Sequence, residues 1–259
     1  MAQSLMTVIL ATMTEYVKHH LRPCVALVSA FLISGAGCNR AKNGAAMKTH
    51  HPDSHRDHDA RSTEGGHRHH IKRTPEEWAQ KLDADERDEW QKPERLVSLI
   101  QLEQGHTVAE IGAGTGYFLR YLSGAVGAEG RVLARDVEAD LVDYMKKRAA
   151  REALPNVTAA ICSHDDPALP CNSVDRILLV NTWHHISKRA LYSKRLAEAL
   201  GPRGRLYIVD FEKGSPIGPP PEDKLTPEEV LEELEAAGLN ATRIEEDLPE
   251  QYVIVATTP

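Results

Sequence analysis

The sequence predicts an α/β protein, a mostly parallel β-sheet with helices on both of its faces. Short apolar runs of strand length alternate with longer segments whose apolar residues recur at helical spacing. A turn with three glycines, residues 112–116, directly follows the first of these runs. The last two runs are separated only by DLPE (247–250), which is too short for a parallel crossover. These two strands are therefore expected to pair antiparallel.

The expected elements begin near Thr74. This residue has the pattern of a helix N-cap, with Pro75 at the first helical position and Glu77 at the third. A second helix is expected after Pro93. The expected strands are 107–111, 131–135, 157–161, 175–180, 205–210, 241–246 and 251–256. The helices expected between strands are 115–126, 138–153, 187–200 and 226–238.

Two further signals mark boundaries near the C-terminus. Pro202 and Gly204 predict a turn that leads into the strand at 205–210. Thr226 repeats the N-cap pattern, since Pro227 and Glu229 follow it at the same spacing. Both signals place the fifth strand and the last helix in the alternating pattern.

Residues 1–38 are interpreted as a signal or lipoprotein-like segment. Lys18 and Arg22 precede a 14-residue apolar run, 24–37. The run is shorter than the ~20 residues that span a bilayer, and it has the length of a signal-peptide core. It ends in small residues before Cys38, which resembles the lipidated cysteine of bacterial lipoprotein signals. We expect an exported protein anchored to the membrane through Cys38; the alternative is a cytoplasmic protein whose start site is misassigned.

Residues 39–73 are predicted to be a disordered linker. The stretch is polar, and seven of the 13 histidines of the chain lie between His50 and His70. So few apolar side chains cannot offset the entropy of ordering the chain. No pair of these histidines sits on a fixed scaffold, so we predict a solvated linker with only loose affinity for zinc or copper and no defined metal site; the alternative is a His-rich tract that binds metal.

Charge and cysteine content exclude several classes of function. The net charge is −7 and aromatic residues form 5% of the chain, so no nucleic-acid partner is expected. The four cysteines are too scattered for a disulfide framework and lack metal-type spacing.

The glycine turn itself favours one kind of nucleotide. It reads G-x-G-x-G, whereas the dinucleotide fingerprint G-x-G-x-x-G would need a glycine at Tyr117. Glu110 lies two residues before the first glycine, where it would repel a pyrophosphate and attract a positive amino or sulfonium group. An NAD-dependent oxidoreductase therefore remains only as an alternative.

Four segments carry a resemblance to a known family. They are VAEIGAGTGYF, VLARDVEADLVDYM, SHDDPALPCNSVDRILLVNTWHHI and LGPRGRLYIVDF. In order and spacing they resemble the motifs of class I S-adenosylmethionine-dependent methyltransferases, especially the ubiquinone/menaquinone-biosynthesis-like group, over about residues 90–256. The resemblance implies a methyltransferase domain at 74–259. Its fold would be a Rossmann-like, seven-stranded, mostly parallel sheet with an antiparallel last strand.

The resemblance also implies a site for S-adenosylmethionine at the carboxyl ends of the parallel strands. Glu110 would contact the amino group of the cofactor, and Asp136 would accept hydrogen bonds from both ribose hydroxyls. Asp165 would contact the adenine amino group, with Asp166 as the alternative. Asn181 would lie at the edge that faces the methyl donor. The backbone would approach the methionine part and ribose at Gly112, Gly114 and Gly116.

The expected chemistry is in-line transfer of the sulfonium methyl group to an unidentified small-molecule acceptor. The enzyme must align the two reactants and exclude water, and it needs a base only if the acceptor loses a proton. His184 and His185 are candidate bases after the fourth strand, and Asp210 ends the fifth strand beside the expected acceptor pocket. The alternative for both histidines is a packing role in their loop. The residues expected to cover the site are Trp90, Gln91 and Tyr117, and the alternative for Trp90 is a place in the core.

A different class of function also fits the sequence. The methyl donor is made in the cytosol, whereas the N-terminus resembles an export signal. The alternative to an enzyme is therefore a non-catalytic, cofactor-binding exported lipoprotein that retains the methyltransferase fold.

Overall fold

The computed structural model describes residues 73–259. The predicted signal segment, the lipidation site at Cys38 and the predicted linker up to residue 72 lie outside the described residues. Among the described residues, no helix is both long enough and apolar enough to cross a membrane.

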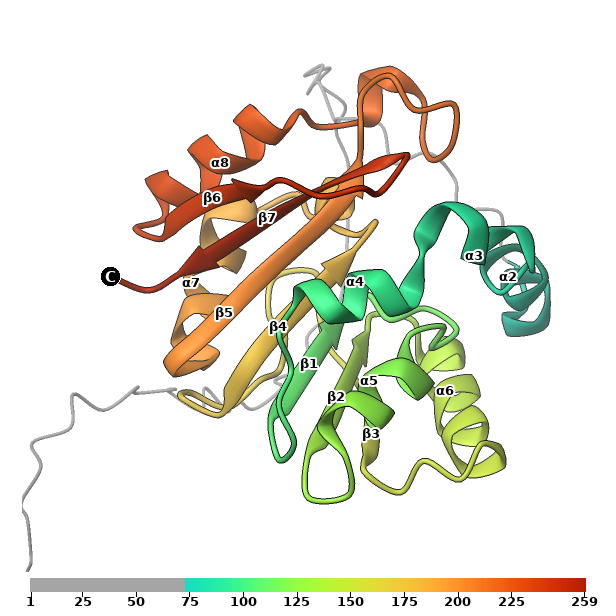
Figure 1. Cartoon of the computed structure of the whole chain (residues 1–259). Coiled ribbons are helices and arrows are strands. Elements are labelled where there is room, and N and C mark those ends of the chain that lie inside the picture. Colours follow the sequence, from blue (N-terminus) through green and yellow to red (C-terminus); the bar gives the residue numbers. More distant parts are fainter. Residues whose placement is uncertain (1–72) are drawn as a thin grey trace, which may run out of the picture. The chain divides into compact units, whose positions relative to one another are not determined.

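The core of the domain is a seven-stranded sheet with the order β3-β2-β1-β4-β5-β7-β6 (Figure 1). Neighbouring strands from β3 to β5 pair in parallel, whereas β7 runs antiparallel to both β5 and β6. This confirms the predicted fold class and the antiparallel pairing of the last two strands. The strands are β1 (Thr107–Ile111), β2 (Arg131–Asp136), β3 (Val157–Ile161), β4 (Val174–Val180), β5 (Leu200–Phe211), β6 (Asn240–Ile244) and β7 (Gln251–Thr257).

Helices cover both faces of this sheet, as predicted. The α-helices are α2 (Pro75–Leu82), α3 (Glu86–Gln91), α4 (Pro93–Leu99), α5 (Leu119–Val126), α6 (Ala139–Arg151), α7 (Arg189–Ala199) and α8 (Pro227–Ala236). Two short 3-10 helices are η1 (Trp183–His185) and η2 (Pro221–Asp223). One apolar cluster packs α4, α5 and α6 against one face, and a second packs α7 and α8 against the other.

Side-chain alternation along the strands produces these two clusters. Val108 packs in the first cluster and its neighbour Ala109 in the second, and Val209 and Ile208 on β5 divide in the same way. Successive strand residues point to opposite faces, so a strand between two helical layers must be apolar on both. All five residues of β1 are buried, including Glu110, which is the one charged residue in that strand.

Capping residues begin two of the helices where the sequence predicts. Thr74 Oγ1 accepts a hydrogen bond from the Glu77 amide at 3.2 Å, and the Glu77 carboxylate accepts from the Thr74 amide at 2.8 Å. Thr226 and Glu229 form the same reciprocal pair at the start of α8. Each such cap contributes about 0.5–2 kcal/mol to stability.

Two predicted boundaries are wrong. The helix expected from residue 115 begins only at Leu119, because the glycine turn continues to Gly116 with φ of +81°. The fifth strand begins at Leu200, so Pro202 and Gly204 lie inside it. The β4–β5 register shifts between Val174 and Arg176, and the extra residues of β5 form an irregularity there. Proline lacks an amide donor and is tolerated at such a position.

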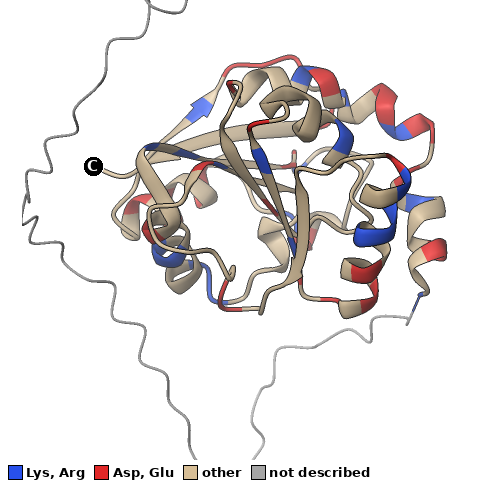
Figure 2. Cartoon of the chain, turned by 90° about the horizontal axis from the view of Figure 1, so that it is seen from below, with Lys and Arg blue, Asp and Glu red and all other residues tan. Residues whose placement is uncertain are grey.

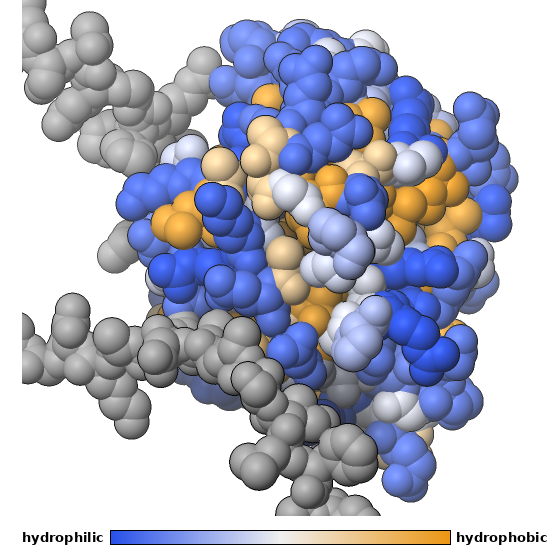
Figure 3. Space-filling view, turned by 90° about the vertical axis from the view of Figure 1, so that its left-hand side faces the viewer, coloured by the Kyte–Doolittle hydropathy of each residue, from blue (hydrophilic) through white to orange (hydrophobic). Residues whose placement is uncertain are grey.

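The surface of the domain carries charges of both signs. Lys and Arg are interspersed with Asp and Glu over its helices and loops (Figure 2). The face seen in Figure 3 is largely hydrophilic, and apolar residues reach the surface there in small groups. Among the described residues, the large apolar side chains that remain exposed are Val137, Ile161 and Leu191.

Candidate active site

The glycine turn packs closely against two neighbouring strands. Gly112, with φ of +70°, donates its amide to the Arg135 carbonyl at 2.8 Å, which ties the turn to the end of β2. A Cβ at Gly112 would lie 2.4 Å from Thr182 Cγ2, in the loop after β4. Glycine is therefore required at position 112 for the backbone conformation and for packing, in addition to any approach of a ligand.

Asp136 at the end of β2 holds the middle of the same turn. Its carboxylate accepts hydrogen bonds from the Gly114 amide at 2.8 Å and from the Glu138 amide at 3.0 Å. Burial raises the pKa of Asp136, although these backbone donors oppose the rise. A carboxylate has about four acceptor positions, so Asp136 keeps acceptor capacity for the ribose of the cofactor.

Glu110 is a buried acid at the carboxyl end of β1. It is 3% exposed, and its Oε2 has no hydrogen-bond partner. Burial raises the pKa of this carboxyl group to about 8, while Arg87 and Arg148 oppose the rise. An unpartnered buried acid is costly unless a ligand supplies a donor or a positive charge. The amino group of S-adenosylmethionine provides both, so the residues here fit that cofactor.

Hydrogen bonds and a cation–π contact hold the segment that contains α2 and α3 over the glycine turn. Asp83, between these helices, accepts hydrogen bonds from Thr115 Oγ1 at 2.9 Å and from Arg148 Nη1 at 2.8 Å. The Tyr117 hydroxyl donates to Asp88 of α3. The Arg87 guanidinium lies over the Tyr117 ring, 3.9 Å from its centroid.

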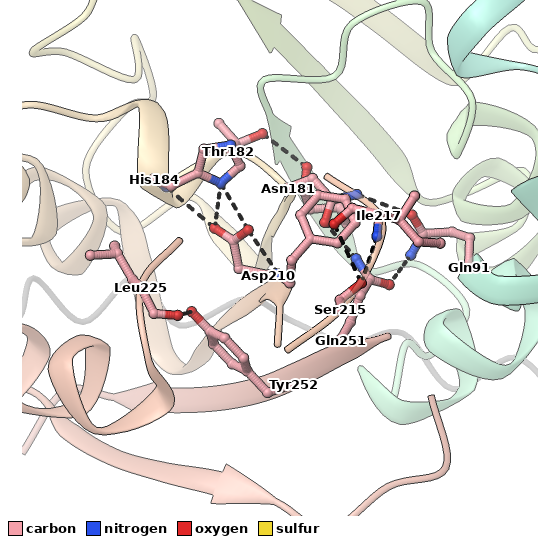
Figure 4. Close-up of polar contacts among 12 residues, drawn as sticks. Gln91, Asn181, Thr182, His184, Asp210, Ser215, Ile217, Leu225, Gln251 and Tyr252 are labelled. Carbon is pink, nitrogen blue, oxygen red and sulfur yellow. Dashed lines mark hydrogen bonds and ion pairs between the residues drawn. The ribbon is translucent and has the colours of Figure 1, made fainter. Parts of the chain in front are cut away.

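Asn181 belongs to a ring of three amides, which we call the amide ring (Figure 4). Gln91 Nε2 donates to Gln251 Oε1 at 2.5 Å, and Gln251 Nε2 donates to Asn181 Oδ1 at 2.5 Å. Asn181 Nδ2 closes the ring by donating to Gln91 Oε1 at 3.4 Å. Gln91 and Gln251 are fully buried. The amide of Asn181 is thus held by the protein, so it orients α3 and β7 at the edge where the sequence predicts the methyl donor.

His184 and Asp210 form a buried pair at the carboxyl ends of β4 and β5 (Figure 4). His184 Nδ1 lies 2.8 and 3.0 Å from the two Asp210 oxygens, and the two side chains are 5% and 3% exposed. The same carboxylate accepts from the Phe211 amide at 2.9 Å and from the His184 amide at 3.3 Å. The structure therefore brings together two of the three predicted catalytic residues.

The aromatic residues near this pair include one that the sequence predicts as a cover. The rings of Trp90 and Phe211 are 5.8 Å apart, and the His184 ring lies 6.4 Å from Phe211. The third catalytic candidate, His185, is exposed, with its ring 4.1 Å from that of His184. Helix α3 thus places Trp90 and Gln91 on the histidine side of the site, whereas its Arg87 lies over Tyr117.

Asp165 and Asp166 lie in the loop after β3 and have different surroundings. The Asp165 side chain is 45% exposed and pairs with Lys188 at 3.3 Å, which is the main reason that its pKa is lowered. Asp166 accepts from the Ala168 amide at 2.8 Å and pairs with Arg195 at 2.9 Å. Asp166 therefore shapes the loop, and Asp165 is the more accessible of the two.

No group of three or more His, Cys, Asp or Glu side chains within residues 73–259 has the arrangement of a metal site. Cys162 is buried, Cys171 is exposed, and neither forms a disulfide.

Comparison with known proteins agrees with this geometry. The family described as "Methyltransferase domain" matches residues 108–204. The structure is also similar to that of a SAM-dependent methyltransferase from Aquifex aeolicus. The two are 33% identical with a TM-score of 0.67, over 71% of this chain and 98% of that one. The chain belongs to the S-adenosylmethionine-dependent methyltransferases. S-adenosylmethionine is its cofactor, and the dinucleotide alternative is set aside.

The curated relatives align with less than half of this methyltransferase. It is 26% identical to the ubiquinone/menaquinone biosynthesis C-methyltransferase of Cellvibrio japonicus over 110 residues, which are 42% of this chain and 44% of that protein. It is 27% identical to the protein-L-isoaspartate O-methyltransferase of Aeropyrum pernix over 129 residues, 49% of this chain and 44% of that protein. The chain thus spans less than half the length of these relatives. Their names point to two different acceptor atoms, and they do not support the non-catalytic alternative.

Three polar residues of this site were missed by the sequence analysis: Asp83, Arg87 and Gln251. Gln251 carries a usable signal, because it begins an apolar strand expected to run antiparallel. The amino end of such a strand meets the carboxyl ends of the parallel strands. Asp83 and Arg87 stand in a charged helical segment, DADERDEW, whose pattern equally fits a solvated surface.

Proposed function

We propose that this methyltransferase acts on a small-molecule acceptor that loses a proton during the reaction, with His184 as its base. The observation that carries the proposal is the buried His184–Asp210 pair. An ionised carboxylate only accepts hydrogen bonds, so Nδ1 of His184 carries the proton and Nε2 carries the free lone pair. Asp210 also stabilises the imidazolium that forms when Nε2 takes a proton.

The proposed step moves one proton to His184 and one methyl group to the acceptor. Nε2 of His184 takes the proton of the acceptor and leaves an electron pair on the acceptor atom. Bound S-adenosylmethionine would supply the methyl group to that electron pair, and its sulfur would keep the electron pair of the broken carbon–sulfur bond, which gives S-adenosylhomocysteine. The chain contributes orientation of the base through Asp210 and exclusion of water through Trp90 and Phe211.

A methyl-transfer screen tests this function. Cell-extract fractions are incubated with methyl-labelled S-adenosylmethionine and either the wild-type protein, His184→Gln or His106→Gln. His106 is a matched control because it lies beside Glu103 before β1, at the opposite end of the sheet. We expect a labelled small molecule with wild type and His106→Gln, and strongly reduced labelling with His184→Gln. Equal labelling by His184→Gln, or an acceptor without a removable proton, would overturn the base role.

We also propose that the protein is exported and lipidated at Cys38. The support is the cationic segment, the apolar run and the small residues before this cysteine. Processing that is sensitive to globomycin and blocked by Cys38→Ala supports the proposal. A product found only in the soluble cytoplasmic fraction would favour the misassigned start site.

A further inference from the structure

Two unpartnered polar atoms, one on an acid and one on a base, are buried beside the glycine turn. Among the described residues, the buried side-chain nitrogen and oxygen atoms without a hydrogen-bond partner are Arg87 Nε, Glu110 Oε2 and Arg195 Nε. Arg195 lies in α7 and pairs with Asp166, on the other face of the sheet. Arg87 and Glu110, in contrast, both adjoin the glycine turn: Glu110 lies in β1 two residues before Gly112, and the Arg87 guanidinium stacks on Tyr117, which directly follows Gly116.

The Arg87 guanidinium is held in a fixed position that leaves one N–H unused. Its Nη1 donates to the Leu82 carbonyl at 2.6 Å, and its Nη2 donates to Gln91 Oε1 at 3.2 Å. Its carbon lies 3.9 Å from the Tyr117 ring centroid and 5.7 Å from that of Phe118. Stacking of this kind favours the cation and fixes the plane of its donors. The remaining donor, Nε–H, is therefore directed by the protein before any ligand binds.

Arg87 and Glu110 do not satisfy each other. Both residues are described by the structure, and no ion pair joins them. A ligand that satisfied both groups must present a donor or cation to Glu110 and an anion to Arg87, on the two flanks of the same turn. An α-amino carboxylate has this pair of charges on neighbouring atoms, and S-adenosylmethionine ends in one. A phosphate would suit Arg87 alone and would be repelled by Glu110 once that group ionises.

We infer that Arg87 binds the carboxylate of the cofactor's methionine part while Glu110 takes its amino group. The inference rests on the proposed position of the cofactor at the glycine turn. It makes α3 a part of the cofactor site, and it gives Arg87 a role in selecting the full amino-acid end of the ligand.

This contact also connects the two ends of the site. Gln91 Oε1 accepts from Arg87 Nη2 and from Asn181 Nδ2, so one oxygen joins the Arg87 guanidinium to the amide ring. The same Gln91 oxygen therefore helps to fix the positions of Arg87 and of Asn181, at the end of β4. Arg87 acts in this arrangement as a binding residue, and Gln91 as the residue that positions it.

Calorimetric binding of two ligands tests the inference. S-adenosylmethionine and its decarboxylated analogue share the sulfonium, ribose and adenine, and differ in the carboxylate. Wild type is expected to bind S-adenosylmethionine about 10- to 100-fold more tightly, as a charge-assisted hydrogen bond to a partly buried arginine provides. Arg87→Met should bind both ligands with nearly equal affinity. Arg120→Met is the matched control, because Arg120 also stacks on a tyrosine, Tyr121, but is exposed, and this variant should keep the preference.

Different results test the role of Arg87 and the position of the cofactor separately. Equal binding of the two ligands by wild type, or an unchanged preference in Arg87→Met, would overturn the role of Arg87 alone. Failure of wild type to bind either ligand would overturn the cofactor position as well. If Arg87→Met does not fold, as judged by circular dichroism, Arg87→Lys provides the test. It keeps the charge but loses the Nε donor, and its preference should be clearly reduced.

Discussion

The two sides of the site differ in whether their buried polar groups have hydrogen-bond partners within the protein. On the donor side, Glu110 in β1 and Arg87 in α3 each keep a buried polar atom without a hydrogen-bond partner. On the acceptor side, at the ends of β4, β5 and β7, the His184–Asp210 pair and the amide ring hydrogen-bond among themselves. Unsatisfied charges specify the charges of the ligand that completes them, whereas a satisfied network specifies little about its ligand. The structure therefore defines the methyl donor much more closely than the acceptor.

The largest expected effect is on the acceptor side. Asp210→Asn replaces the carboxylate that orients His184, and the amide can stabilise the tautomer with the proton on Nε2. We expect methyl transfer to slow by about 100- to 10,000-fold, the range of a lost general base, with unchanged affinity for S-adenosylhomocysteine. Single-turnover rates and calorimetry measure the two quantities. Weakened cofactor binding in this variant would show that the acceptor side affects the affinity of the donor side.

The second-largest expected effect is on the free energy of unfolding, which should depend on pH through Glu110 on the donor side. Its pKa in the folded protein is about 8, against an ordinary value of 4.5, so the unfolded chain loses this proton first. The contribution of Glu110 to stability is therefore fully present below its ordinary pKa and is lost as pH rises toward the folded value. The loss is on the order of a few kcal/mol.

Glu110→Gln removes this titration. Urea unfolding at the two ends of that pH window should show a smaller fall in the free energy of unfolding for the variant than for wild type. Parallel pH dependences would contradict the buried, unpartnered state of Glu110. In addition, wild type should release a proton when the cofactor's amino group binds near neutral pH. Calorimetry in buffers of different ionisation enthalpy detects that proton, and Glu110→Gln should lack it.

A smaller effect is expected at Asp136. Asp136→Asn retains the shape of the side chain but loses the charge that would accept from the ribose hydroxyls. Cofactor affinity should fall by about 1–3 kcal/mol, the usual contribution of hydrogen bonds to a charged group. Asp175→Asn is the control, because Asp175 also accepts from a backbone amide, that of Thr107 at 2.8 Å, at the other end of the sheet. Equal affinities for Asp136→Asn and wild type would refute the ribose role.

The smallest effect is expected at Asp165, which is solvated and paired with Lys188. Asp165→Ala should weaken cofactor binding by less than Asp136→Asn does, because water can replace an exposed carboxylate. Asp166→Ala should leave binding unchanged and alter the loop that it holds through Ala168 and Arg195. The reverse order of effects in a binding titration would assign the adenine contact to Asp166.

Most of the fold could be predicted from the sequence because its signals are local. The N-cap residues Thr74 and Thr226, the alternating apolar runs and the short DLPE link each act within a few residues. The boundaries at Leu119 and Leu200 could not, because they depend on how the glycine turn and the β4–β5 irregularity fit against neighbouring strands. Helix and strand ends depend on tertiary contacts more than their centres do.

In the candidate site, too, some features could be predicted from the sequence and others only from the structure. The sequence by itself determined the glycine turn, the acids at the ends of β1 and β2, and the placement of His184 and Asp210 at one edge of the sheet, because the carboxyl ends of neighbouring parallel strands share that edge. Only the tertiary structure decided that Asn181 is held in the amide ring and that Arg87 stacks on Tyr117. Those contacts join residues as far apart as Gln91 and Gln251, and they depend on how α3 docks on the sheet. A charged helical segment contains no local signal of which of its side chains becomes buried, so that choice is made by packing alone.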